Sequence, residues 1–133
     1  MIRRSTLLAA LLVAGCETIT APARVSGQWG GEHVGLMLND GGGGALDYDC
    51  AAGSIDGPVM TDTAGRFIAT GTHTPGHGGP DRIGEVPPRH PATYSGSVRG
   101  DLMTLVIDVP AIAARIGPYR LRRGAMPNLM RCL

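Results

Sequence analysis

Side chains that could bind a metal ion are concentrated in one stretch of the sequence. They are three histidines and two carboxylates, namely His73, His77, Asp81, Glu85 and His90. Imidazole nitrogens and carboxylate oxygens are ligands of zinc and other divalent metals. His73 and His77 have the spacing that places two imidazoles on one face of a helix, but Pro75 and Gly76 disfavour a helix there. The stretch is a candidate ligand or metal loop, and no definite metal site is predicted.

The segment Thr74–Pro91, which carries most of these side chains, is the longest irregular part of the chain. It is rich in proline and glycine and shows no alternation of apolar and polar residues, which predicts a loop. Long loops in compact domains are often binding loops or lids. The alternative is a proline-stiffened surface connection without a function of its own.

Patterns typical of catalytic sites are absent from the sequence. It has no recognisable Ser-His-Asp arrangement, nucleophile elbow or carboxylate pair, and the run Gly41–Gly44 lacks the Lys and Ser or Thr of a phosphate loop. We therefore expect a protein that is not an enzyme and needs no cofactor. A metal-dependent hydrolase or metal-binding protein is the alternative. Twelve basic residues oppose eleven acidic ones, which argues against a nucleic-acid partner because phosphate binding needs a basic surface.

Residues 1–15 have the features of an export signal. Arg3 and Arg4 precede the apolar run Leu7–Val13, which small residues connect to Cys16. A basic start, a short apolar region and a small-residue cleavage site are typical of a secretory signal peptide. The apolar run is much shorter than the ~20 residues that a membrane span requires. We therefore expect this segment to be removed.

The sequence Leu12-Val13-Ala14-Gly15-Cys16 resembles the lipobox of bacterial lipoproteins. This resemblance implies cleavage before Cys16, lipid attachment to its sulfur, and anchoring to a membrane of the cell envelope on the periplasmic side. It does not distinguish the inner from the outer membrane. The alternative is an ordinary exported protein with a chance cysteine. Residues 16–26 would then form a lipidated tether, and residues 27–133 the folded domain.

The two remaining cysteines, Cys50 and Cys132, are predicted to form a disulfide bond. Disulfides persist in exported proteins, and an even number of cysteines remains once Cys16 carries lipid. The alternative is a pair of free or metal-binding thiols, although no CxxC or Cys/His spacing accompanies them.

From Gly27 onward, alternating apolar and polar residues predict short β-strands. The first two expected strands end at Leu38 and Cys50, and a turn follows at Ala51–Gly53. The remaining expected strands are Ser54–Met60, Arg66–His73, Thr93–Arg99, Leu102–Val109, Pro118–Arg123 and Asn128–Leu133. Short links favour antiparallel pairing, and about eight such strands can close into a small up-and-down barrel without exposed edges. A two-sheet sandwich is the alternative. In the barrel, the last strand would lie near the first two, and both sulfurs would face the apolar side.

Two further resemblances concern the domain. Gly27-Gln28-Trp29 is similar to the Gly-x-Trp opening of lipocalin and avidin-like barrels, which implies a barrel with the Trp closing one end. Nearly the whole domain resembles a group of small uncharacterised bacterial lipoproteins, through Trp29-Gly30-Gly31, Asp49-Cys50-Ala51, Gly65-Arg66-Phe67, His77-Gly78-Gly79-Pro80 and Tyr94-Ser95-Gly96. Neither resemblance implies an activity. We expect a lipid-anchored, non-enzymatic envelope protein that binds a small or lipidic ligand or assists an envelope protein.

Overall fold

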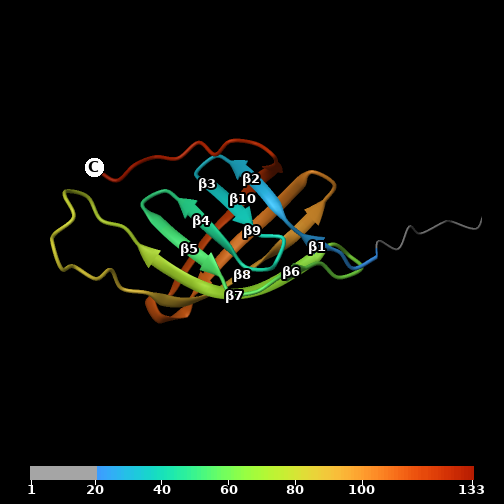
Figure 1. Cartoon of the computed structure of the whole chain (residues 1–133), viewed down its shortest axis with the longest axis horizontal. Helices are drawn as coiled ribbons and strands as arrows, with labels where there is room; N and C mark the ends of the chain where they lie inside the picture. The colour runs from blue at the N-terminus through green and yellow to red at the C-terminus, as the bar shows by residue number, and fades with distance from the viewer. Residues whose placement is uncertain (1–20) are drawn as a thin grey trace, which may run out of the picture.

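The computed structural model describes residues 21–133, and the predicted signal peptide and Cys16 lie outside this range. Eight strands form a closed antiparallel barrel (Figure 1). They are β2 (Gly27–Gly31), β3 (Val34–Leu38), β4 (Gly44–Tyr48), β5 (Ala51–Ile55), β7 (Arg66–Pro75), β8 (His90–Arg99), β9 (Leu102–Val109) and β10 (Ala114–Arg123). The predicted all-β, up-and-down barrel is confirmed.

Neighbouring barrel strands follow one another along the chain, except where β10 pairs with β2 and closes the barrel. This closure brings Arg123 opposite Trp29 and Arg122 opposite Gly30. Outside the barrel, β1 (Arg24–Val25) and β6 (Val59–Met60) form a separate two-stranded sheet. A short 3-10 helix, Pro110–Ile112, connects β9 to β10. Within residues 21–133, no helix is long and apolar enough to cross a membrane.

Alternate positions along each strand fill the interior of the barrel. Because successive side chains of a strand point to opposite faces, one apolar set is buried and the other set is solvated. The largest of the fully buried side chains include Trp29, Tyr94, Leu46, Met103, Leu105, Ile107 and Leu121. The Nε1–H of Trp29 donates a hydrogen bond to the carbonyl of Ser26 at 3.1 Å, and the Arg123 guanidinium lies 4.3 Å from the centre of its ring. The only Trp of the chain is thus held where β1 leads into the barrel.

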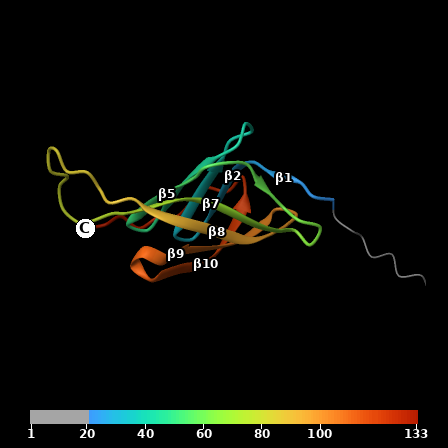
Figure 2. The same cartoon turned by 90° about the horizontal axis from the view of Figure 1, so that it is seen from below.

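The barrel has two different ends, which the views in Figures 1 and 2 separate along the long axis. At the entry end, the described chain begins and β1 leads into β2. At the loop end lie the connection between β7 and β8, residues 76–89, and the C-terminus. We call residues 76–89 the long loop. Residues 124–133, which run from the entry end to the loop end, are called the C-terminal segment.

Several predicted strand boundaries are wrong. Ala51–Gly53 is not a turn but the start of β5; the turn is at Asp49 and Cys50, where Cys50 adopts a φ of 57°. The predicted strand Ser54–Met60 is divided, because β5 ends at Ile55 and Val59–Met60 pairs with β1.

The predicted final strand, Asn128–Leu133, is also wrong. The glycine-rich segment Gly27–Gly31 is itself a strand, so β10 already closes the barrel against it. The C-terminal segment therefore has no place in the sheet. Its one ladder contact is an isolated bridge between Asn128 and Glu32.

Candidate functional site

The long loop is the most exposed part of the loop end. β7 and β8 remain paired up to His73 and His90, so the loop spans residues 76–89 rather than the predicted Thr74–Pro91. Every residue in it is exposed. At its tip, Ile83 is fully exposed and Val86 is 87% exposed. Covering these two side chains would remove apolar surface from water, which is favourable.

The base of the long loop is fixed to the rest of the loop end. The Gly76 N–H donates a hydrogen bond to the carbonyl of Cys50 at 2.7 Å. A side chain at Gly78 would collide with the backbone of Leu133, so only glycine allows the C-terminal residue to approach so closely. The tip therefore projects from a base that is held by backbone contacts.

The candidate metal ligands are separated by the barrel wall. His73 is only 3% exposed; its Nδ1 shares a hydrogen bond with the Tyr48 hydroxyl, and the two rings stack with centroids 5.6 Å apart. Burial, followed by the nearby His90, lowers the pKa of His73, and burial raises the pKa of Tyr48. This arrangement favours an uncharged pair that belongs to the core. His90 is half-buried opposite His73.

His77 lies outside the barrel with the two predicted carboxylates. Its Nε2 is 3.5 Å from Glu85 and 3.7 Å from Asp81. A hydrogen bond with the Gly78 carbonyl, and then the charge of Glu85, raise the pKa of His77. The predicted set is thus divided into His73 with His90 and His77 with the carboxylates. Among residues 21–133, no three suitable side chains are placed to hold a metal ion.

The C-terminal segment crosses the outer face of β2 and β3 over two glycines. Gly30 and Gly35 are partner positions in the ladder. A Cβ atom at Gly35 would lie 2.9 Å from the Pro127 ring, and one at Gly30 would collide with the Ala125 carbonyl. Because these glycines have no side chains, they leave a shallow glycine trough on the sheet in which the C-terminal segment lies.

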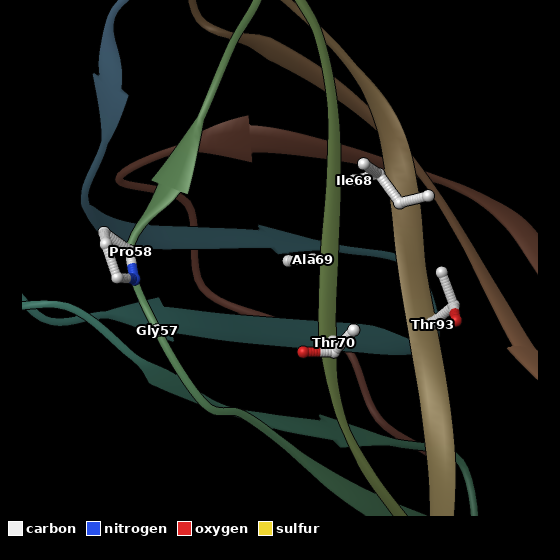
Figure 3. Close-up of a pocket in the computed structure, with 6 residues that line it drawn as sticks. All are labelled: Gly57, Pro58, Ile68, Ala69, Thr70 and Thr93. Atoms are coloured by element: carbon white, nitrogen blue, oxygen red, sulfur yellow. The ribbon is translucent and has the colours of Figure 1, made fainter.

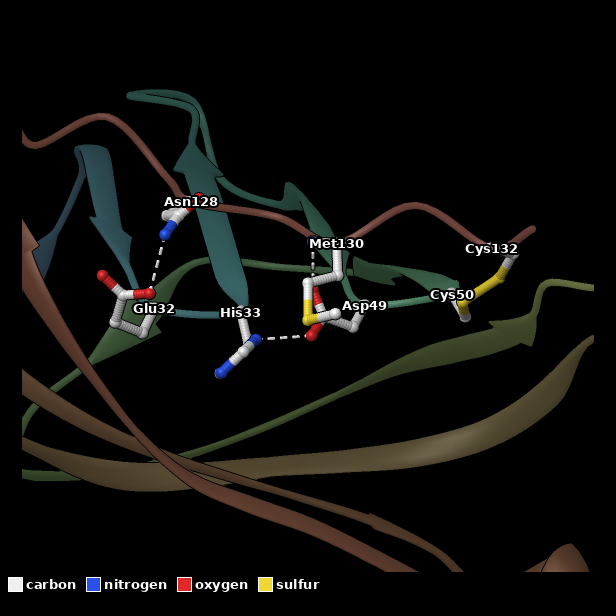
Figure 4. Close-up of polar contacts among 7 residues, drawn as sticks. All are labelled: Glu32, His33, Asp49, Cys50, Asn128, Met130 and Cys132. Carbon is white, nitrogen blue, oxygen red and sulfur yellow. Dashed lines mark hydrogen bonds and ion pairs between the residues drawn. A yellow bond between two sulfur atoms is a disulfide. The ribbon is translucent and has the colours of Figure 1, made fainter.

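Polar contacts continue this attachment toward the loop end, as Figure 4 shows. The Asn128 amide donates to Glu32 at 2.8 Å, and the Met130 N–H donates to Asp49 at 2.6 Å. The second oxygen of Asp49 lies 2.5 Å from His33 Nδ1. Asp49 directly precedes Cys50 in the chain, so these contacts lie next to the disulfide.

The predicted disulfide between Cys50 and Cys132 is confirmed, with Cα atoms 5.1 Å apart. Its predicted place on the apolar face is wrong, because Cys50 is exposed in a turn and Cys132 lies in the C-terminal segment. The bond attaches the segment to the turn beneath the long loop. Disulfide, C-terminus and loop base thus form one unit.

Shallow hollows lie on the outer surface of the barrel. The one in Figure 3 has a volume of about 370 Å³ and lies between the β5–β6 connection and the outer face of β7 and β8. Its lining is Gly57, Pro58, Ile68, Ala69, Thr70 and Thr93, which supplies no charged group. The interior, in contrast, is filled by large side chains. Among the described residues, this packing gives no support to a ligand held inside the barrel.

Sequence reasoning missed the Tyr48–His73 pair, although a signal was present. His73 shares its parity with Phe67 and Gly71, so period-2 alternation already placed it on the inner face. The glycine trough had no such signal, because it depends on the register between β2 and β3. No protein-family model, curated protein or solved structure matches this chain.

Proposed function

We propose that the protein is a non-enzymatic, lipid-anchored component of the bacterial cell envelope that presents its loop end to a protein partner. The observation that carries the proposal is the opposite placement of the chain entry and the long loop (Figure 1). A lipid on Cys16 would hold the entry end near the membrane. The exposed tip, Ile83 and Val86, would then point away from that membrane, where a partner can cover it.

The chemistry of the tip supports a protein rather than a small molecule as the partner. Ile83 and Val86 stand on a protruding loop, whereas small ligands bind in concave, enclosed sites. Arg82 precedes Ile83 and Glu85 precedes Val86, and both are exposed, so the tip combines apolar side chains with charges of both signs. Protein interfaces commonly have an apolar core and a polar rim. A complementary apolar groove on another envelope protein fits this tip.

The anchor is tested by the variant Cys16→Ser. We expect the wild type to sediment with membranes and to resist extraction by salt, because two or three acyl chains anchor a protein stably. The variant should no longer incorporate labelled palmitate, whether or not its leader segment remains attached. Circular dichroism of the variant should keep the strand signal, because the predicted anchor lies outside the barrel. A wild-type protein that salt extracts from membranes would contradict the anchor.

The partner is tested by photo-crosslinking in cells. A crosslinking residue at position 83 should give one discrete protein adduct, whereas the same residue at Thr104, an exposed position on the outer face of β9, should not. Val86→Ser should reduce the adduct from position 83 while leaving the melting temperature unchanged, since Val86 is 87% exposed. Equal adducts from positions 83 and 104, or none from position 83, would contradict a partner at the tip.

A further inference from the structure

Two arginines flank an exposed leucine on the outer face of the barrel near its entry end. Arg99, Leu102 and Arg122 are successive partner positions across β8, β9 and β10. All three are exposed, and Leu102 is 52% exposed. Because directly opposite residues on one face of a sheet have neighbouring side chains, the three form a continuous row.

This row continues into a groove between β10 and the C-terminal segment. The groove has a volume of about 450 Å³, and Arg120, Arg122, Leu102 and Met126 line it. Met126 is 80% exposed. Glu32 lies on the same lining, where it accepts the hydrogen bond from Asn128. We call Arg99, Leu102, Arg120, Arg122 and Met126 the arginine face.

Three arginines and the single carboxylate of the groove lining, Glu32, leave the arginine face with a net positive charge. Among residues 21–133, no carboxylate forms an ion pair with Arg99, Arg120 or Arg122. The nearby Asp101 is engaged by Arg123 at 3.1 Å. The face thus combines three cations with two exposed apolar side chains, which suits a partner that offers both anions and hydrocarbon.

The arginine face lies close to where the chain enters the barrel. The Gly124 N–H, just after β10, donates to the Gln28 carbonyl of β2 at 2.7 Å, and β1 directly precedes β2. The carbonyl of Ala23 accepts a hydrogen bond from Thr61 at 2.9 Å, which ties the chain to the domain. From Cys16 to that point there are about seven residues, which reach at most about 25 Å. An anchored barrel would thus stay near its membrane.

We propose that the arginine face binds the anionic phospholipid headgroups of the membrane to which the chain is anchored. The orientation rests on the proposed function, whereas the charge and the apolar side chains do not. Each arginine near an anionic bilayer surface contributes measurable attraction that salt screens. Leu102 and Met126 add contact with the hydrocarbon border. Binding there fixes the tilt of the barrel, which an anchor at Cys16 alone does not determine.

The test measures how strongly the chain that carries Cys16→Ser binds to vesicles of two compositions. Vesicles of phosphatidylcholine alone and vesicles with an equal amount of phosphatidylglycerol are sedimented with the protein. Binding should be stronger to the anionic vesicles, and high salt should remove the difference. A leader segment that remained attached would itself prefer anionic vesicles through Arg3 and Arg4, so the decisive comparison is between this chain and the same chain with the arginine face altered. Arg99→Gln with Arg122→Gln should weaken binding to anionic vesicles by at least about tenfold.

The matched control removes two arginines from the opposite end, through Arg82→Gln with Arg89→Gln in the long loop. This control has the same net charge as the test variant and should bind like the parent chain. Equal weakening by both pairs, or no preference for anionic vesicles, overturns the proposal. If Cys16→Ser cannot be obtained in soluble form, hydrogen exchange of the wild type in the two vesicle types replaces it. Slower exchange at 100–104 in anionic vesicles then supports the proposal, and identical exchange overturns it.

Failure of the anchor is distinguishable from failure of this inference. If the wild type carries no lipid but still prefers anionic vesicles through Arg99 and Arg122, only the anchor is refuted. If the wild type carries lipid but its unlipidated form does not prefer anionic vesicles, only the arginine face is refuted.

Discussion

Replacing Cys50 or Cys132 with alanine should lower the free energy of unfolding by about 2–5 kcal/mol. The two cysteines are 82 residues apart, so their bond removes much of the conformational freedom of the unfolded chain. It also holds the C-terminal segment, whose other attachments are a few hydrogen bonds and the contact with Gly30 and Gly35. Urea denaturation followed by circular dichroism measures the loss.

The double variant should be no less stable than either single variant, because all three lack the same bond. Wild type treated with a reducing agent is the matched control and should unfold at the same urea concentration as the variants. If the single variants and the reduced wild type differ in free energy of unfolding by several kcal/mol, the substitutions change stability by more than the loss of the bond.

The variant Trp29→Ala should lose about 3–5 kcal/mol of stability. Trp29 is completely buried, its indole N–H has a partner in Ser26, and its ring supports the guanidinium of Arg123. Alanine leaves a large cavity at the point where β2 meets the closing strand β10. Because the chain has a single Trp, unfolding of the variant must be followed by circular dichroism.

The control is Trp29→Phe, which keeps an aromatic ring in the core but lacks the N–H group. It should retain well over half of the stability that alanine loses. A cost below about 1 kcal/mol for Trp29→Ala, far under the usual range for a buried aromatic, would mean that the entry end can collapse around the gap or that Trp29 is not packed as described.

Much of the barrel was predictable because one face of each strand is apolar. Val34, Leu36 and Leu38 alternate with Gly35 and Met37; the first three are buried, whereas Met37 is 46% exposed. Gly27–Gly31 escaped prediction as a separate strand, because glycine gives no alternation and Trp29 is its one large inward side chain. The same reasoning wrongly assigned Met130 and Cys132 to a strand, because they alternate as strand residues do. The closed barrel has no free edge with which such a strand could pair.

The candidate site was predictable only in part, for a related reason. Cysteine number predicted the Cys50–Cys132 bond, and proline with glycine predicted the long loop. Whether His73 lies beside His77 depends on where β7 ends, and β7 continues to Pro75. His73 therefore remains inside the wall. The arginine face depends on the partner positions of three strands, which residue patterns do not specify.

The pairing of β2 with β10 also determines the order in which the barrel can be completed. β2 is the first barrel strand to leave the ribosome, and the strand that covers its second edge, β10, is the last. Trp29 and Arg123 are partner positions, so this pairing must wait for almost the whole chain. Contacts between such distant residues slow folding, and unpaired strand edges favour aggregation in the meantime. A chain that stops before residue 114 keeps two open edges, at β2 and at β9.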